Sequence, residues 1–128
     1  MVWYLDTSAF LKLVVAEAES PAMRAWHASH GPLWSSQLLQ TEARRAGKRL
    51  GLYPEAIDDA LDTVSLVSPT DATFRRAGDL PPASLRSLDA LHLAAALELG
   101  ADLEGMIVYD ERLAAAAATH SVVVLKPQ

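Results

Sequence analysis

The chain has 128 residues, of which 51% are hydrophobic, and its 16 acidic and 11 basic residues give a formal net charge of -5. This length predicts one domain, residues 1–128, with a single sizeable core. The acidic balance excludes a protein that holds nucleic acid mainly through a basic surface. With no cysteine, disulfides, thiolate zinc sites and cysteine nucleophiles are excluded, and a cytoplasmic location is expected.

No apolar run approaches the ~18 residues that a membrane span needs, so we expect no contact with a membrane. No Lys or Arg precedes the short apolar stretch at the N-terminus, which argues against a signal peptide.

Predicted strands and helices alternate along the first half of the chain. Residues 2–5 suit a strand covered on both faces, and a helix begins at Thr7. A second helix begins at Ser20 and ends before Gly31, and residues 33–34 form a very short strand. Ser35 or Ser36 is expected to cap the next helix. Gly51 ends that helix.

The alternation continues in the second half. We expect strands at 64–67, 106–109 and 122–125, and helices at 54–61, 70–78, 84–99 and 111–119. In the helix at 84–99 an inward stripe is predicted, which consists of Leu85, Leu88, Leu91, Ala95 and Leu99. The pattern indicates an α/β domain with a mainly parallel sheet. In such sheets ligands bind beyond the carboxyl ends of the strands.

Four acids stand where a shared pocket would need them. Asp6 and Asp110 each follow a predicted buried strand, Asp89 lies in a helix of Leu and Ala, and Glu42 lies near a helix start. Each also has an ordinary explanation. Asp6 and Asp110 suit helix N-caps. Glu42 has Arg45 as an ion-pair partner three residues on, and Asp89 has Arg86 at the helix start.

A cluster of carboxylates is ligand chemistry for a hard cation. Packed together without a cation, the acids would repel one another and raise one another's pKa. Mg²⁺ and Mn²⁺ prefer oxygen ligands and remove that cost. A metal site that acts on a phosphodiester is therefore one hypothesis for these four residues, beside the capping and ion-pair explanations.

The chain resembles the PIN-domain ribonucleases, and in particular the VapC-type toxins of bacterial toxin–antitoxin pairs. The motifs that carry the resemblance occur in order over almost the whole chain: YLDTSAFLKL, SSQLLQTEARRA, LDALHLAAALELGA, VYDERLAAAA and VVVLKP. It implies a PIN-like three-layer α/β/α fold with a central, mainly parallel sheet. It also implies an endoribonuclease dependent on Mg²⁺ or Mn²⁺, with Asp6, Glu42, Asp89 and Asp110 as metal-binding catalytic residues.

The resemblance also indicates supporting residues. The hydroxyl that often accompanies the first acid falls on Thr7 or Ser8. Many relatives carry Thr or Ser two residues before the last acid, where this chain has Val108. Ser8 or Ser36 would then support more of the site. A family member that keeps the fold as a binding module without catalysis is the alternative, and a phosphatase-like or receiver-like α/β protein is a third possibility.

The resemblance, together with several apolar and basic residues, predicts the macromolecular partners of this protein. It implies an RNA substrate, a VapB-like antitoxin and a homodimer formed through helices. We expect the antitoxin on the helices of the first half, near Trp26, Leu38, Leu39 and Leu52. Arg44, Arg45, Lys48 and Arg49 form a basic run that suits either a solvated helix face or a grip on RNA phosphates. A lone His92 on its Leu/Ala helix favours a hydrogen-bonded packing residue over a metal ligand.

Overall fold

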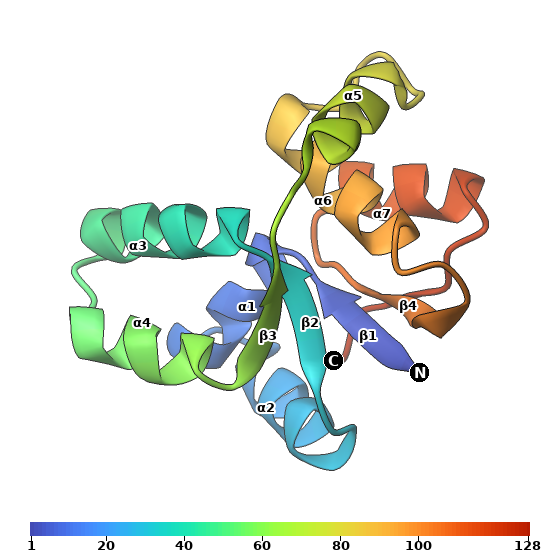
Figure 1. The fold of residues 1–128 in the computed structure, drawn as a ribbon. Coiled ribbons are helices and arrows are strands. Elements are labelled where there is room, and N and C mark those ends of the chain that lie inside the picture. The colour runs from blue at the N-terminus through green and yellow to red at the C-terminus, as the bar shows by residue number, and fades with distance from the viewer.

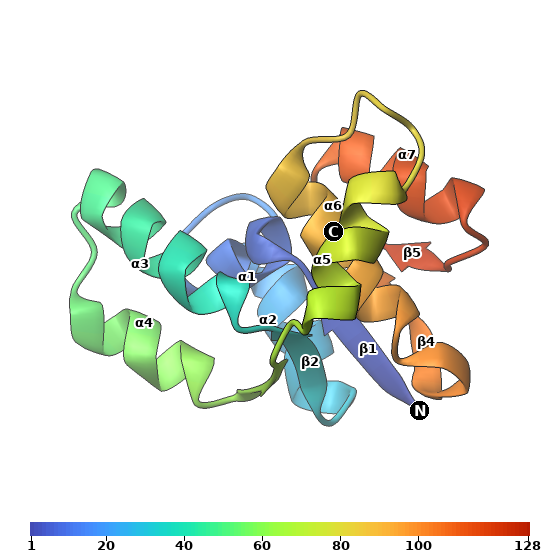
Figure 2. The ribbon, with the colours of Figure 1, turned by 45° about the horizontal axis from the view of Figure 1, so that its top comes forward.

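The protein, described here by a computed structural model of residues 1–128, is a five-stranded parallel sheet between helices. In the sheet the strand order is β3-β2-β1-β4-β5 (Figures 1 and 2). The strands are β1 (Val2–Leu5), β2 (Leu33–Ser36), β3 (Val64–Val67), β4 (Leu103–Ile107) and β5 (Val124–Leu125). The helices are α1 (Thr7–Val14), α2 (Ser20–Ser29), α3 (Leu38–Leu50), α4 (Pro54–Leu61), α5 (Asp71–Asp79), α6 (Ser87–Leu97) and α7 (Glu111–Thr119), with a short 3-10 helix η1 (Gly100–Asp102).

Both faces of the central strands are buried, as their unbroken apolar sequences predict. Successive side chains of a strand point to opposite faces. Trp3 and Leu5 therefore join one core cluster, while Tyr4 between them joins the other. Ile107 and Met106 of β4 divide in the same way. The two clusters form the two interfaces of a three-layer α/β/α fold.

Helices α1 to α4 supply the first interface, and helices α6 and α7 supply the second. Each of these four helices contributes to the first cluster, for example through Phe10, Met23, Leu39 and Ile57. The second contains Leu93, Leu113 and other residues of α6 and α7. Helix α5 lies against α6 (Figure 2), and small alanine side chains form the contact between them. None of the helices combines the length and the apolar character needed to cross a bilayer.

The helix predicted at 84–99 differs from the observed one in length and in phase. It begins at Ser87, because Arg86 is extended and Leu85 belongs to the preceding turn, and it ends at Leu97. Leu88 is exposed, so its place in the inward stripe was wrong. Instead the helix buries five consecutive residues, 92–96, because it lies between α5, α7 and the sheet. A stripe phased on Leu85 does not describe a helix that is covered on more than one side.

Smaller differences concern ends of elements. Strand β2 continues through Ser36, so Ser35 caps nothing and is buried in the sheet. Ser36 does accept a hydrogen bond from the Leu38 N–H at 3.2 Å, although Gln37 is the N-cap residue of α3. Strand β4 covers 103–107 rather than 106–109, and β5 is limited to two residues. The predicted start of α1 is confirmed, and so are both predicted ends of α4 and α7.

Gly105 of β4 allows the close approach of Trp3, and this contact generates a stability prediction. A Cβ at Gly105 would collide with the Trp3 ring and lie 2.6 Å from the Val123 carbonyl oxygen. We expect Gly105→Ala to lower the free energy of unfolding by about 1–3 kcal/mol through overpacking. Urea denaturation monitored by circular dichroism measures it.

Gly78→Ala is the matched control. A Cβ at Gly78 in α5 meets nothing within 4 Å. Alanine there should stabilise the helix by about 0.5 kcal/mol. If both substitutions shift the urea midpoint in the same direction, the close packing of Gly105 against Trp3 does not limit stability.

Candidate active site

The sheet reverses its strand order between β1 and β4, so the carboxyl ends of these two strands lie side by side at the switch point. From β1 the chain adds β2 and β3 on one side and β4 and β5 on the other. Leu5 pairs with Ile107 at the end of these neighbouring strands. Asp6 follows β1 directly, and Asp110 follows β4 after two residues. In open parallel sheets this is the position where ligands bind.

Asp6 is a buried carboxylate that caps helix α1. Its Oδ1 accepts a hydrogen bond from the Ala9 N–H at 3.1 Å and another from the Ser8 hydroxyl at 2.7 Å. Its Oδ2 makes no hydrogen bond within the protein. Burial raises the pKa of Asp6 from 3.8 to about 6, and the Ser8 hydroxyl offsets part of that rise. Capping therefore uses one carboxylate oxygen and leaves the other for a ligand.

The Ser8 hydroxyl joins the ends of the two central strands. It donates to Asp6 and accepts from the backbone N–H groups of Tyr109 at 3.0 Å and Asp110 at 3.3 Å. One side chain on α1 thus sets the position of Asp6 relative to the turn that carries Asp110. Val108 cannot supply such a contact, because its side chain is apolar and fully buried.

A single arginine connects Asp110 and Asp89. Asp110 caps α7 through Oδ1, which accepts from the Leu113 N–H at 2.9 Å. Its Oδ2 accepts from the Arg86 Nη2 at 3.2 Å, and the Arg86 Nε donates to the Asp89 Oδ2 at 3.1 Å. Burial raises the pKa of the Asp89 carboxyl, and the charge of Arg86 opposes that rise. The Arg86–Asp89 ion pair anticipated from sequence is present, and Asp110 is a second partner.

Glu42 is held by a buried chain of hydrogen bonds. His92 Nε2 lies 2.7 Å from Glu42 Oε1, and His92 Nδ1 lies 2.7 Å from the Tyr4 hydroxyl. A carboxylate only accepts, so Nε2 carries the proton and Nδ1 accepts from Tyr4. Burial raises the pKa of Tyr4 far above its usual range, so its hydroxyl remains a donor. The expected Glu42–Arg45 ion pair is not formed, and His92 is a hydrogen-bonded packing residue.

These contacts bring the four candidate acids into one connected region. Thr7 Oγ1 lies 3.3 Å from His92 Nε2, which relates the start of α1 to Glu42. Glu42 and Asp89 line one cavity of about 320 Å³ together with Arg86. Asp89 and Asp110 share Arg86, and Asp6 and Asp110 share Ser8.

The donor chemistry of this region fits Mg²⁺ or Mn²⁺, because every candidate ligand is a carboxylate oxygen. The unpaired Oδ2 of the buried Asp6 is an acceptor suited to a cation. No three His, Asp or Glu side chains are arranged as ligands around a common point. Glu42 instead contacts His92, and the Asp89 and Asp110 Oδ2 atoms contact Arg86.

The basic run of α3 lies on exposed positions. Arg44 forms an ion pair with Asp58 of α4, and no ion pair forms at Arg45, Lys48 or Arg49. Leu39 is fully buried and belongs to the core, so its assignment to an antitoxin surface was wrong. Trp26, Leu38 and Leu52 are half-buried, and Trp26 and Leu52 pack against the first core cluster.

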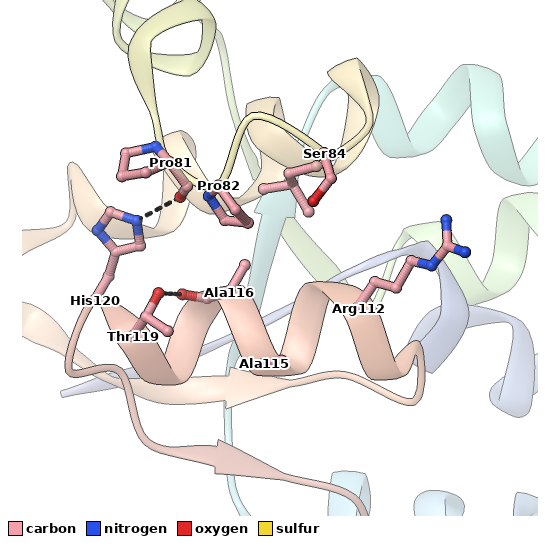
Figure 3. A pocket seen from close by; sticks show the side chains of 9 residues that line it. Pro81, Pro82, Ser84, Arg112, Ala115, Ala116, Thr119 and His120 are labelled. Carbon is pink, nitrogen blue, oxygen red and sulfur yellow. Dashed lines mark hydrogen bonds between the residues drawn. The ribbon is translucent and has the colours of Figure 1, made fainter.

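The largest cavity lies elsewhere, between the Pro81-Pro82 turn and α7 (Figure 3). It has a volume of about 750 Å³, and none of the four acids lines it. His120 Nε2 lies 3.0 Å from the Pro81 carbonyl oxygen at one end of it, and Arg112 stands at the other end (Figure 3). The carboxylates, not the volume of a cavity, identify the candidate site.

Comparison with known proteins agrees with this geometry. The PIN domain family model matches residues 3–119, so the chain belongs to the PIN domain family. Within that family it is similar to ribonuclease VapC46 of Mycobacterium tuberculosis, at 38% identity over 97% of this chain and 96% of that protein. Ribonuclease VapC47 of the same species is 35% identical, over 86% of this chain and 85% of that protein.

Solved structures share the fold. VapC20 of Mycobacterium tuberculosis, described as a sarcin-ricin loop cleaving toxin, superposes with a TM-score of 0.74 at 19% identity, over 98% of this chain and 99% of that chain. A chain of VapBC2 from Rickettsia felis, solved bound to a DNA fragment from their promoter, gives a TM-score of 0.67 at 9% identity over the full length of both chains.

The raised pKa of Asp6 generates a prediction about pH. If the pKa of a carboxyl group is higher in the folded than in the unfolded protein, the folded state binds more protons. The contribution of Asp6 to stability therefore falls as pH rises from about 4 to about 6. Asp6→Asn removes this effect and keeps a capping oxygen. In EDTA we expect the two proteins to be similarly stable at pH 4, and the Asn variant to be about 1–3 kcal/mol more stable at pH 7.

Urea denaturation at both pH values measures the difference. Asp102→Asn, at an exposed acid of η1, is the control and should show no such trend. An Asp6→Asn protein that unfolds more easily than wild type at pH 7 would show that the Asp6 carboxylate stabilises the metal-free fold.

Proposed function

We propose that the protein is the endoribonuclease toxin of a type II toxin–antitoxin system, dependent on Mg²⁺ or Mn²⁺ and neutralised by a VapB-like antitoxin. The observation that carries the proposal is the connected set of Asp6, Glu42, Asp89 and Asp110 at the switch point of the sheet. Relatives named VapC ribonucleases, similar over nearly the whole chain, support the same reaction.

In this proposal the four carboxylates would hold the metal. When bound, such an ion supplies Lewis-acid stabilisation of the charge that develops on a phosphodiester under attack by water. The chain itself positions the ligands. Ser8 fixes Asp6 Oδ1 and the Asp110 backbone, so that Asp6 Oδ2 would be the oxygen left to hold an ion.

His92 and Thr7 support Glu42 in the same way. The Nε2–H of His92 donates to Glu42, and the Tyr4 hydroxyl fixes the tautomer of the ring from the other side. Partners of this kind orient metal ligands and raise their basicity. Ser36 acts further away, because its hydroxyl accepts from the N–H of Leu38 at the start of the helix that carries Glu42.

We also propose two protein partners. A VapB-like antitoxin would cover the half-buried apolar side chains Trp26, Leu38 and Leu52 in the first half of the chain. A second copy of the chain would form a homodimer through helices. Exposed Leu50, Tyr53 and Phe74 support that arrangement, since large apolar side chains on a surface favour association.

Substitution of the acids tests the reaction. We expect Asp6→Asn and Asp89→Asn each to lower RNA cleavage by more than about a hundredfold, since loss of a partner of a metal ligand alone costs about 10–100-fold. Both variants should also relieve growth inhibition when expressed without antitoxin. Cleavage products of total RNA, separated on gels in Mg²⁺ or Mn²⁺, report the activity.

Asp102→Asn is the control here too, because it removes an equal charge from an exposed position outside the site. Full cleavage by Asp6→Asn and Asp89→Asn would refute the metal-dependent reaction. Inactivity of the wild-type protein toward all RNA would favour the binding module that has lost catalysis.

The basic run generates a prediction about salt. We propose that Arg44, Arg45, Lys48 and Arg49 contact RNA phosphates beside the acidic site. Each lost contact to single-stranded RNA should reduce the slope of log K against log salt by ~0.7. Arg45→Ala should show this reduction in filter binding with RNA. Arg75→Ala, which disrupts an exposed Asp71–Arg75 pair on α5, should leave the slope unchanged. Equal slopes for wild type and Arg45→Ala would remove Arg45 from the interface.

A further inference from the structure

Arg86 is the only arginine that forms ion pairs with two acids. Its Nε lies 3.1 Å from Asp89 Oδ2, and its Nη2 lies 3.2 Å from Asp110 Oδ2. Asp89 lies in α6 and Asp110 caps α7, and a strand separates these two helices in the chain. Arg44 and Arg75, in contrast, each pair with one acid on the outer surface. Arg86 therefore links two acids of the candidate site, whereas Arg44 and Arg75 form their ion pairs outside it.

Arg86 contacts one oxygen of each of two acids that a metal ion at this site would also use. Asp110 Oδ1 is engaged in capping α7, so Oδ2 is the atom left for any cation. Arg86 occupies that Oδ2 and the corresponding atom of Asp89. An arginine has only donors and keeps its charge, so it satisfies both carboxylates without a metal. A divalent ion that bound Asp110 Oδ2 would then compete with the guanidinium for that oxygen, and it would oppose the charge of Arg86 at Asp89 as well.

We propose that Arg86 is the resident cation of this site: it bridges Asp89 and Asp110 in the metal-free protein, yields them to the divalent ion, and then binds a phosphate of the RNA. The inference rests on the proposed metal-dependent function. Its second step follows from exposure and charge. The Arg86 side chain is 63% exposed, whereas the side chains of Asp89 and Asp110 are 15% and 29% exposed.

This difference in exposure places the arginine at the rim of the site with the acids beneath it. Once the ion neutralises the acids, the guanidinium has lost its anionic partners. The anion that enters next is the substrate, and a guanidinium matches the paired oxygens of a phosphate. Arg86 is thus a positioning and substrate-binding residue that also lowers the affinity of the site for a divalent ion.

Metal affinity tests the first step. Isothermal titration of the metal-free protein with Mn²⁺ should give a dissociation constant about three- to tenfold lower for Arg86→Gln than for wild type, because two partly exposed ion pairs no longer oppose the metal. Arg112→Gln is the matched control. It removes the same charge two residues after Asp110, from a side chain that forms no ion pair, and should change the constant by less than about twofold.

RNA affinity tests the second step. The substitution Arg86→Gln should weaken RNA binding, whereas it should strengthen metal binding. At saturating Mn²⁺, Arg86→Gln should bind a labelled, mixed-sequence 2′-O-methyl oligoribonucleotide more weakly than wild type, with a salt slope reduced by ~0.7. A merely structural role would weaken binding of both the metal and the RNA. Unchanged or weaker Mn²⁺ binding by Arg86→Gln would overturn the competition, and unchanged RNA binding would overturn the phosphate contact.

The same titration separates this inference from the proposed function. If wild type binds Mn²⁺ and Asp6→Asn does not, the metal site stands, and the Arg86→Gln result decides the inference alone. If wild type and Asp6→Asn bind Mn²⁺ equally weakly, the proposed metal site fails, and the competition fails with it.

Discussion

The burial of Asp6 at the end of the central strand is the constraint on which the rest of the site depends. A carboxylate removed from water is stable only with hydrogen bonds or a cation nearby. The fold supplies two donors, the Ala9 N–H and the Ser8 hydroxyl, and both go to the same oxygen. Even so, the pKa of the group remains raised to about 6. The second oxygen is therefore left in a position where a cation would lower the free energy of the whole site.

The protein has more than one way to neutralise its acids. Arg86 forms ion pairs with Asp89 and Asp110. Glu42 instead accepts from the Nε2–H of the neutral His92 ring, and Asp6 accepts from the Ser8 hydroxyl and the Ala9 N–H. Two of the four acids therefore have a cationic partner, and the other two have neutral donors only.

Much of the fold and part of the candidate site can be predicted from local sequence. Asp6 and Asp110 were found because each follows a buried strand, and the helices that follow them begin where the caps indicated. The prediction that Leu88 faces the core was wrong, because a helix covered on several sides has no single inward stripe. The prediction that Leu39 contacts the antitoxin was wrong, because hydrophobicity alone does not distinguish a core residue from one at an interface.

The sequence by itself determined the alternation of strands and helices, the acids at the strand ends and the pairing of Arg86 with Asp89, because these depend on neighbours within a few residues. Only the tertiary structure decided that Arg86 also reaches Asp110, that Ser8 joins the ends of β1 and β4, and that Tyr4 and His92 orient Glu42. The residues in each of these contacts are 24 to 102 positions apart in the chain. They meet because parallel strands bring their carboxyl ends to one edge of the sheet, and no local pattern specifies which distant side chain will lie there.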